Sequence, residues 1–157
     1  MGQFPENAVL VESMRKSASE RRLGVISREV RKLKDLAPAF DEATSAGAQA
    51  AVFMTDNLLF GDRTRVAELA LTQHLPSMHS FKPEVEDGGL TTYGPALSES
   101  YERAAALADK IIKGARPSEL PVEQPTWFEF AINLRTAKAL GLTLPPSLLA
   151  QADDVFE

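Results

Sequence analysis

The 157-residue chain has no cysteine, a single tryptophan and no long apolar run. Without a thiol it cannot form a disulfide, a zinc–thiolate site or a thiol-based covalent intermediate. No stretch approaches the roughly 20 apolar residues of a membrane helix. The N-terminus also lacks the basic segment and apolar core of a secretory signal. As the sequence is written, we expect a cytoplasmic protein with no membrane insertion.

The sequence also lacks the short motifs of common enzyme classes. It has no glycine-rich dinucleotide or phosphate loop, no H-E-x-x-H zinc motif and no G-x-S-x-G nucleophile elbow. Its two histidines, His74 and His79, fall at a helix end and in a strand, where packed or surface histidines are more common than a metal pair. We therefore expect a non-enzyme with no catalytic residue, no metal and no cofactor.

Basic residues are also fewer than acidic residues. The formal net charge is −5 and the sequence pI is about 5.1. An acidic chain of this kind has no nucleic-acid-binding footprint overall. Hydrophobic residues at 44% and charged residues at 25% are the balance of a soluble globular protein. The length fits one ordinary domain, so we treat residues 1–157 as a single α/β lobe.

Apolar periodicity alternates between helices and short strands along the chain. The strand of residues 50–54 is a continuous apolar run, which is typical of a strand buried on both faces of a parallel sheet. Alternating β and α units predict a three-layer, doubly wound, mostly parallel sheet. The longer predicted helices cover about residues 8–22, 35–47, 60–73 and 96–113, and the strands cover 25–30, 50–54, 76–79, 90–93 and 127–133.

Residues 117–157 form a distinct C-terminal part of the same domain. Pro117, Pro121 and Pro125 indicate an extended connection. The strand of residues 127–133 and a short helix follow. Pro145 and Pro146 then begin a final helix, whose expected inward residues are Leu148, Leu149, Ala152, Val155 and Phe156.

The candidate binding residues follow from this topology, because open α/β sheets bind ligands outside the carboxyl ends of their strands. Asp56 can accept from an ammonium group, Tyr93 offers an aromatic wall, and Gly94 permits close approach of a ligand to the backbone. Residues 55–57 are equally suited to capping the next helix. The candidate set is Thr55, Asp56, Asn57, His79, Tyr93 and Gly94.

The C-terminal part also carries a recognisable signature. It consists of Leu120-Pro121-Val122-Glu123-Gln124-Pro125-Thr126, Phe128-Glu129, Ile132-Asn133-Leu134, Thr136-Ala137-Lys138-Ala139-Leu140-Gly141-Leu142-Thr143 and Pro145-Pro146-Ser147-Leu148-Leu149. This run resembles the C-terminal lobe of the ABC-transporter substrate-binding protein family. Members of that family have type I periplasmic-binding-protein folds and include aromatic amino-acid binders. The resemblance covers about residues 7–157.

The resemblance implies one lobe of a clamp that closes on a small molecule, such as an amino acid, and delivers it to a permease. It places the family's ligand-facing loops on residues 55–57 and around residues 93–94. Family members are periplasmic and about twice as long, so we expect a truncated relative that meets an ABC permease only in a full-length form. The alternatives are a cytosolic regulatory or interaction module that has lost transport and a small enzyme on a flavodoxin-like sheet.

The resemblance also implies that the lobe's first strand is missing. In strand order 2-1-3-4-5 this leaves a gap between the strands of residues 25–30 and 50–54. Unpaired strand edges are costly and recruit partners. The chain must close the gap, pair the edge with another chain, or move residues 25–30 out of the sheet. We expect a homodimer that uses this edge or the apolar cleft face, with the helix of residues 8–22 contributing.

Overall fold

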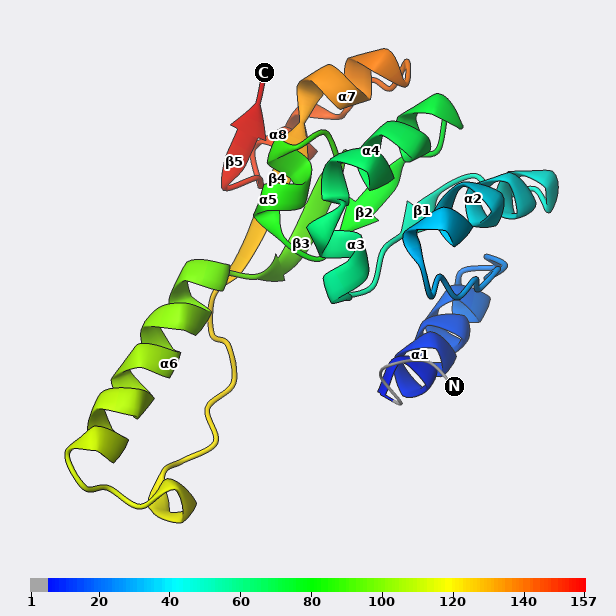
Figure 1. Cartoon of the computed structure of the whole chain (residues 1–157). Helices are drawn as coiled ribbons and strands as arrows, with labels where there is room; N and C mark the ends of the chain where they lie inside the picture. Colours follow the sequence, from blue (N-terminus) through cyan, green and yellow to red (C-terminus); the bar gives the residue numbers. More distant parts are fainter. Residues whose placement is uncertain (1–5) are drawn as a thin grey trace.

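The computed structural model describes residues 6–157 and places a five-stranded sheet at their centre. The strand order follows the sequence, and every neighbouring pair is parallel except β3 with β4. Helices flank this sheet (Figure 1), which confirms the predicted α/β fold with a mostly parallel sheet. The strands are β1 (Ala51–Val52), β2 (Ser77–His79), β3 (Thr91–Pro95), β4 (Phe128–Asn133) and β5 (Asp154–Phe156).

The helices fall near the predicted positions, with two short 3-10 turns at Leu33–Asp35 and Pro117–Glu119. Across residues 6–157, none of them has the length and apolar character needed to cross a membrane. The helices are α1 (Glu6–Glu20), α2 (Leu36–Ser45), α3 (Asn57–Gly61), α4 (Arg63–Thr72), α5 (Lys82–Glu86), α6 (Leu97–Ile112), α7 (Leu134–Ala139) and α8 (Pro146–Leu149).

The main apolar core lies between α2 and α4. Leu36 and Phe40 of α2 pack with Val66 and Ala70 of α4 and with Leu75, and all five side chains are buried. The i, i+4 spacing of these residues places them on one face of each helix, as predicted. Gly47 ends α2 with φ at 84°, a left-handed conformation that favours glycine.

The sheet itself has one well-covered face. Ser77, His79, Thr92, Ala131 and Asn133 are buried, and α5 packs against β2, β3 and β4. The intervening side chains point to the other face, because successive strand residues alternate. That second face is partly open, and its exposed apolar residues are Val52, Met78, Tyr93, Phe128 and Val155.

Residues 25–30 do not form the predicted strand. The segment is irregular and mostly exposed, and only Val30 packs against the core of α2 and α4. Arg15 of α1 donates a hydrogen bond to the carbonyl of Val25 at 3.0 Å. Among the described residues, 25–30 have no strand with which to pair, and they lie outside the sheet. The homodimer expected at this edge stays a prediction.

The strand at residues 50–54 is also corrected by the structure. Only Ala51 and Val52 form β1, which pairs with β2 alone and is therefore an edge strand. The Val52 side chain is 53% exposed, so the strand is not buried on both faces. The apolar run predicted a strand buried on both faces, because periodicity does not report whether both faces of the sheet are covered at that strand.

The C-terminus ends in a strand rather than in the predicted long helix. Helix α8 has four residues, and Asp154–Phe156 pairs in parallel with β4 as β5. The turn between them is held by Asp153, whose carboxylate accepts a hydrogen bond from the Phe130 N–H at 2.8 Å. The apolar residues assigned to one helix face therefore belong to two elements.

The predicted helix of residues 60–73 is two helices, α3 and α4, divided at Asp62. The long helix predicted over residues 96–113 forms as α6, but it does not lie against the sheet. No residue of α6 is buried, and the helix leads away from the sheet (Figure 1). The segment after it returns beside the helix to enter β4. We refer to residues 96–127 as the arm and to the remaining described residues as the body.

Candidate functional site

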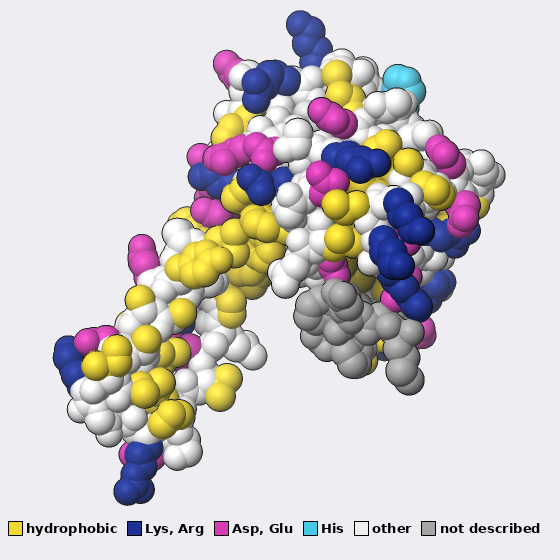
Figure 2. All heavy atoms as spheres, viewed as in Figure 1, with side chains coloured by type: hydrophobic (Ala, Val, Ile, Leu, Met, Phe, Trp, Pro, Cys, Tyr) yellow, Lys and Arg dark blue, Asp and Glu magenta, His cyan; other side chains and the backbone are white. Residues whose placement is uncertain are grey.

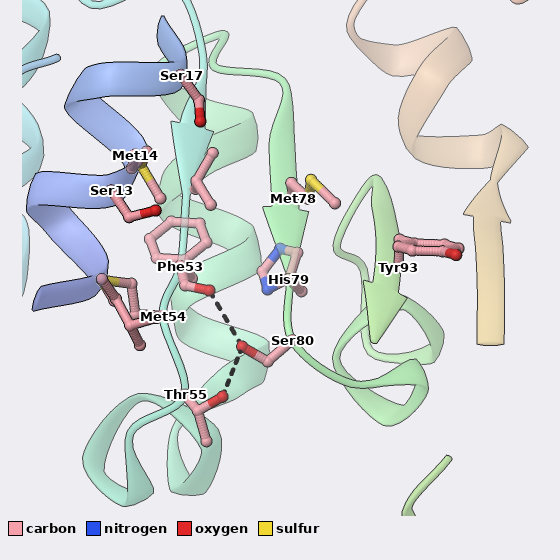
Figure 3. Close-up of a pocket in the computed structure, with 12 residues that line it drawn as sticks. Ser13, Met14, Ser17, Phe53, Met54, Thr55, Met78, His79, Ser80 and Tyr93 are labelled. Atoms are coloured by element: carbon pink, nitrogen blue, oxygen red, sulfur yellow. Dashed lines mark hydrogen bonds between the residues drawn. The ribbon is translucent and has the colours of Figure 1, made fainter. Parts of the chain in front are cut away.

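A cavity of about 410 Å³ lies between α1 and the carboxyl ends of β1 and β2 (Figure 3). The volume falls within the range of small-molecule sites. Most of its wall is apolar, and among the described residues that line it there is no Asp, Glu, Lys or Arg. The lining residues are Leu10, Ser13, Met14, Ser17, Val52, Phe53, Met54, Thr55, Met78, His79, Ser80 and Tyr93.

Hydroxyl groups fix the segment that follows β1 onto the segment that follows β2. The Thr55 hydroxyl donates to Ser80 Oγ at 3.1 Å, and the Ser80 hydroxyl donates to the Phe53 carbonyl at 3.2 Å (Figure 3). Thr55 is exposed and Ser80 is half-buried. The ends of the two strands thus place two hydroxyl groups side by side in a wall that is mostly apolar.

Asp56 and Asn57 lie just outside this lining. Asp56 is the N-cap of α3, and its Oδ1 accepts a hydrogen bond from the Leu58 N–H at 2.7 Å. This capping bond satisfies a backbone donor that the first turn of a helix leaves unpaired. Asn57 is the first residue of α3 and is exposed. The capping interpretation therefore holds for Asp56, whose second carboxylate oxygen makes no protein hydrogen bond among the described residues.

His79 is packed beneath the cavity and is almost fully buried. Its ring lies 4.9 Å from the Phe53 ring, centroid to centroid, and its Nε2 is 3.1 Å from Ser77 Oγ. Ser77 Oγ also accepts the Leu90 N–H at 3.1 Å. His79 Nδ1 faces Glu84 Oε1 at 3.5 Å.

Glu84 is a residue that the sequence interpretation missed. Its side chain is nearly buried, and one carboxylate oxygen accepts the N–H groups of Ser80 at 3.1 Å and Phe81 at 2.8 Å. These bonds orient the segment that carries the Ser80 hydroxyl into the cavity. The available signal was a proline in the first turn of α5 followed by a glutamate, a common pattern at helix starts.

Tyr93 and Gly94 have different surroundings. Tyr93 borders the cavity, but its side chain points away from the other lining residues (Figure 3) and its ring stacks on Phe128 of β4 with centroids 5.8 Å apart. The Tyr93 side chain is 60% exposed. A Cβ at Gly94 would collide with the Ser80 carbonyl oxygen. The close approach that we expected from a ligand is therefore made by the backbone at Ser80, and Gly94 is needed for the packing of β3.

The structure thus brings Thr55, His79 and Tyr93 to one cavity, while Asp56 and Asn57 lie beside it and Gly94 supports it from within the sheet. The contribution of α1 was missed, because a helix stripe gives no indication of which surface it faces. Leu10, Ser13, Met14 and Ser17 form that wall. Within residues 6–157, no group of three or more His, Asp or Glu side chains gathers as metal ligands do.

Comparison with known proteins identifies both the family and the fold. Residues 3–156 match a family model described as ABC transporter substrate binding protein. One similar structure is a conserved domain protein from Vibrio cholerae, with TM-score 0.86 and 21% identity over 95% of this chain and 50% of that one. A search of curated proteins found no match.

Two further structures carry functional descriptions. The ABC domain from Streptococcus pneumoniae, solved in complex with L-Trp, has TM-score 0.85 and 25% identity over 96% of this chain and 52% of that one. The ligand-free substrate-binding protein CD0873 from Clostridium difficile has TM-score 0.69 and 20% identity over 98% of this chain and 51% of that one. The present chain therefore spans about half the length of the solved structures that it resembles.

Proposed function

The chain belongs to the ABC transporter substrate binding protein family, and we propose that it forms one lobe of a small-molecule clamp. The observation that supports this proposal most strongly is that Thr55, His79 and Tyr93, from three successive strands or the segments after them, all border one cavity. The family is one of binding proteins, and the proposed role is binding without catalysis.

We expect the ligand to be an amino acid with an aromatic or branched side chain. The cavity wall is formed largely by methionine and aromatic side chains, which suit an apolar ligand group. The Thr55 and Ser80 hydroxyls, which already donate their protons within the protein, can accept from an ammonium group, and Asp56 at the rim can accept from it as well. The complex of the Streptococcus pneumoniae protein with L-Trp supports this choice.

Binding by this chain alone is expected to be weak, because only one wall of the site is present. A good pocket buries most of a small ligand's surface, and a single lobe leaves much of it in water. We expect a dissociation constant of about 1 mM or higher, which corresponds to roughly 4 kcal/mol or less. In a two-lobed receptor the second wall would tighten binding, and the loaded clamp would deliver its ligand to an ABC permease.

Methyl NMR of methionine-labelled protein tests the proposal, because Met14, Met54 and Met78 all line the cavity. Titration with L-Trp should shift these three methyl signals with one shared dissociation constant of about 1 mM or higher. L-Glu, an acidic comparator, should leave the signals in place. Unchanged signals with every aromatic and branched amino acid would contradict the proposed site, and micromolar binding would contradict the one-wall argument.

Two pairs of variants locate the ligand. Asp56→Asn keeps a good N-cap but removes the charge, so it should weaken binding without unfolding α3. Asp62→Asn, at the next helix start, is its control. Tyr93→Ala should weaken binding, whereas Tyr101→Ala, which removes the chain's other tyrosine from the exposed arm, should leave binding unchanged. If the two variants of either pair had equal effects on binding, the ligand would bind at a different place on the protein.

An interaction module is the second candidate function, and the uncovered apolar stripe of α6 favours it. Under this alternative the lobe would be retained as a scaffold, and the amino-acid titration would give no shift at the cavity methyl groups.

A further inference from the structure

His79 and Glu84 form a buried pair beneath the cavity, and the proposed binding role does not use the histidine nitrogen that faces the carboxylate. Their side chains are 0% and 6% exposed, and His79 Nδ1 lies 3.5 Å from Glu84 Oε1. This nitrogen is buried and makes no hydrogen bond to any residue within 6–157. A buried polar atom without a partner is rare in a folded protein and calls for an explanation.

The surroundings of His79 hold its ring in place. The Phe53 ring packs against it with centroids 4.9 Å apart, and Gly89 lies so close that a Cβ there would be 2.5 Å from His79 Nε2. The Thr92 hydroxyl also donates to the His79 carbonyl at 2.8 Å. The ring therefore has little room to turn away from Glu84, and Nδ1 gains a partner only by carrying a proton toward the carboxylate.

Both ring nitrogens of His79 face atoms that can accept a hydrogen bond. Nε2 is 3.1 Å from Ser77 Oγ, and Nδ1 faces a carboxylate oxygen of Glu84. A neutral imidazole has one N–H group, whereas a protonated imidazole has two. The protonated ring can therefore donate to Ser77 and to Glu84 at the same time, and the carboxylate offsets its charge.

Among the described residues, Glu84 is the only charged side chain within ion-pairing distance of His79. The parts of α1, β1, β2 and β3 that line the cavity with it carry no Asp, Glu, Lys or Arg. The other titratable groups nearby point away, pair elsewhere or are exposed: Tyr93 points away from the lining, Lys82 contacts Asp154 at 2.7 Å, Asp87 contacts Arg63 at 2.7 Å, and Glu86 is exposed.

Glu84 also connects this pair to the wall of the cavity. Its second carboxylate oxygen, Oε2, accepts the N–H groups of Ser80 at 3.1 Å and Phe81 at 2.8 Å. The Ser80 hydroxyl in turn bonds the segment that follows β1 (Figure 3). A proton shared with His79 would hold the carboxylate at both of its oxygens and would thereby fix the segment that carries the Ser80 hydroxyl.

We propose that His79 and Glu84 form a proton-dependent switch beneath the cavity. When His79 takes up a proton, it forms an ion pair with Glu84 that fixes Ser80 and Phe81, and loss of the proton releases them. Burial disfavours an imidazolium without a partner, and a neighbouring carboxylate favours it. The switch therefore works only while residue 84 carries a negative charge.

NMR of the histidine ring nitrogens tests the switch without a ligand. His74, the chain's other histidine, is exposed just after α4 and serves as the internal reference, and Figure 2 shows histidine at the surface of the body. Between about pH 8 and pH 5, where histidine changes its charge, the His79 signals should convert to those of a doubly protonated ring in the folded protein. A His79 ring that stays neutral throughout would overturn the proposal.

Two matched variants of α5 assign the effect to Glu84. Glu84→Gln keeps the size of the side chain but removes its charge, so His79 should stay neutral over the same pH range while His74 titrates as before. Glu86→Gln removes an exposed charge from the same helix and should leave the His79 titration unchanged. Circular dichroism checks that both variants fold. Equal titration of His79 in the two variants would overturn the proposal.

Hydrogen exchange of the wild-type protein tests the link to the cavity wall and needs no variant. After correction for the intrinsic pH dependence of exchange, the amides of Ser80 and Phe81 should be protected at least about fivefold more at about pH 6 than at about pH 8. Amides of Val66 in the core should be equally protected at both pH values. Equal protection of Ser80 and Phe81 at both pH values would overturn the link.

The effect of the switch on ligand affinity rests on the proposed function. A wall that is already fixed loses less freedom on binding, so L-Trp should bind about two- to threefold more tightly at about pH 6 than at about pH 8. In Glu84→Gln the two affinities should be equal. Equal affinities in the wild-type protein would overturn the coupling to binding. Because the ring titration is read without ligand, it supports or overturns the switch whether or not L-Trp binds.

Discussion

Helices α4 and α6 both carry apolar residues at helical spacing, more sharply segregated to one face in α6, and they have opposite surroundings. Val66, Ala67 and Ala70 of α4 are buried against α2 and the segments around β2, whereas no residue of α6 is buried. The two helices show that an apolar stripe specifies a face that needs a partner without specifying the partner. In the body the partner is another part of the same chain. In the arm, no element among residues 6–157 buries the stripe.

The two regions are also held by different forces. The body has a packed apolar core, and buried polar side chains such as Ser77, Thr92 and Asn133 are hydrogen-bonded within it. The base of the arm is held by a network of Glu99, Arg103, Glu123 and Thr126 that is partly open to water. Solvent-exposed ion pairs contribute little to stability, whereas apolar burial contributes most of it. The predictions below use matched substitutions in the two regions.

The largest expected difference comes from truncating apolar side chains. Leu36 is 1% exposed, and Leu36→Ala should lower the free energy of unfolding by about 2–5 kcal/mol because it leaves a cavity in the core. Ile112→Ala in the arm should change it by less than about 0.5 kcal/mol. Urea unfolding at low protein concentration measures both. Comparable losses would show that the arm stripe is covered within the monomer.

Substitution of a polar side chain should also destabilise the protein more in the body than in the arm, but the difference in unfolding free energy should be smaller. Asn133 is buried, caps α7 by accepting the Thr136 N–H, and donates to the Val85 carbonyl at 2.9 Å. Asn133→Ala should cost about 1–3 kcal/mol because it leaves buried backbone groups unpaired. Arg103→Ala, at the base of the arm, should cost less than about 1 kcal/mol. A larger loss for Arg103→Ala would reverse the comparison.

Within the body, Glu84→Gln should have a moderate effect that extends to binding. Glutamine keeps an acceptor oxygen but loses the charge that strengthens the bonds to the Ser80 and Phe81 N–H groups. We expect a loss of about 1 kcal/mol in stability and weaker ligand-induced shifts at the Met78 methyl group. Glu86→Gln, in the same helix, is the control. Identical behaviour of the two variants would remove Glu84 from the support of the site.

The smallest effect is expected from acidification at the base of the arm. The hydrogen bond from the Thr126 hydroxyl, together with the Trp127 N–H and Arg103, holds the pKa of Glu99 below its ordinary value. Because the pKa is lowered, the Glu99 carboxylate stabilises the base of the arm at every pH above the ordinary glutamate pKa. This contribution to stability is lost as the pH falls through the lowered pKa.

Trp127, the only tryptophan, reports this titration directly. Its fluorescence should stay constant from pH 7 to about pH 5 and change only below the ordinary glutamate pKa of about 4.3. In Glu99→Gln the acid transition should disappear. A transition in the wild-type protein near pH 6 would contradict the assignment to Glu99.

The sequence predicts those parts of the fold that depend on local pattern. The faces of α2 and α4, the strand that ends at His79 and the helix stop at Gly47 follow from periodicity and glycine conformation. The prediction of a strand at residues 25–30 was wrong because a strand needs a neighbouring strand, and sequence periodicity does not report whether one is present. The prediction of one C-terminal helix was wrong because its apolar residues belong to two successive elements, α8 and β5.

The candidate site was predicted to a similar extent. The carboxyl ends of strands predicted the positions of Thr55, His79 and Tyr93, since topology alone brings strand ends together. Glu84 was missed because its role depends on the backbone N–H groups of Ser80 and Phe81, which sequence does not place. The wall formed by α1 was missed because α1 is far in the sequence from the strands that form the rest of the cavity.

Hydrogen exchange tests most directly the claim that the body is covered by other described residues and the arm is not. Amides of α6 should exchange far faster than those of α4 and β3, because little tertiary packing among residues 6–157 protects the arm. Amides of α6 that are as protected as those of α4 would contradict the account.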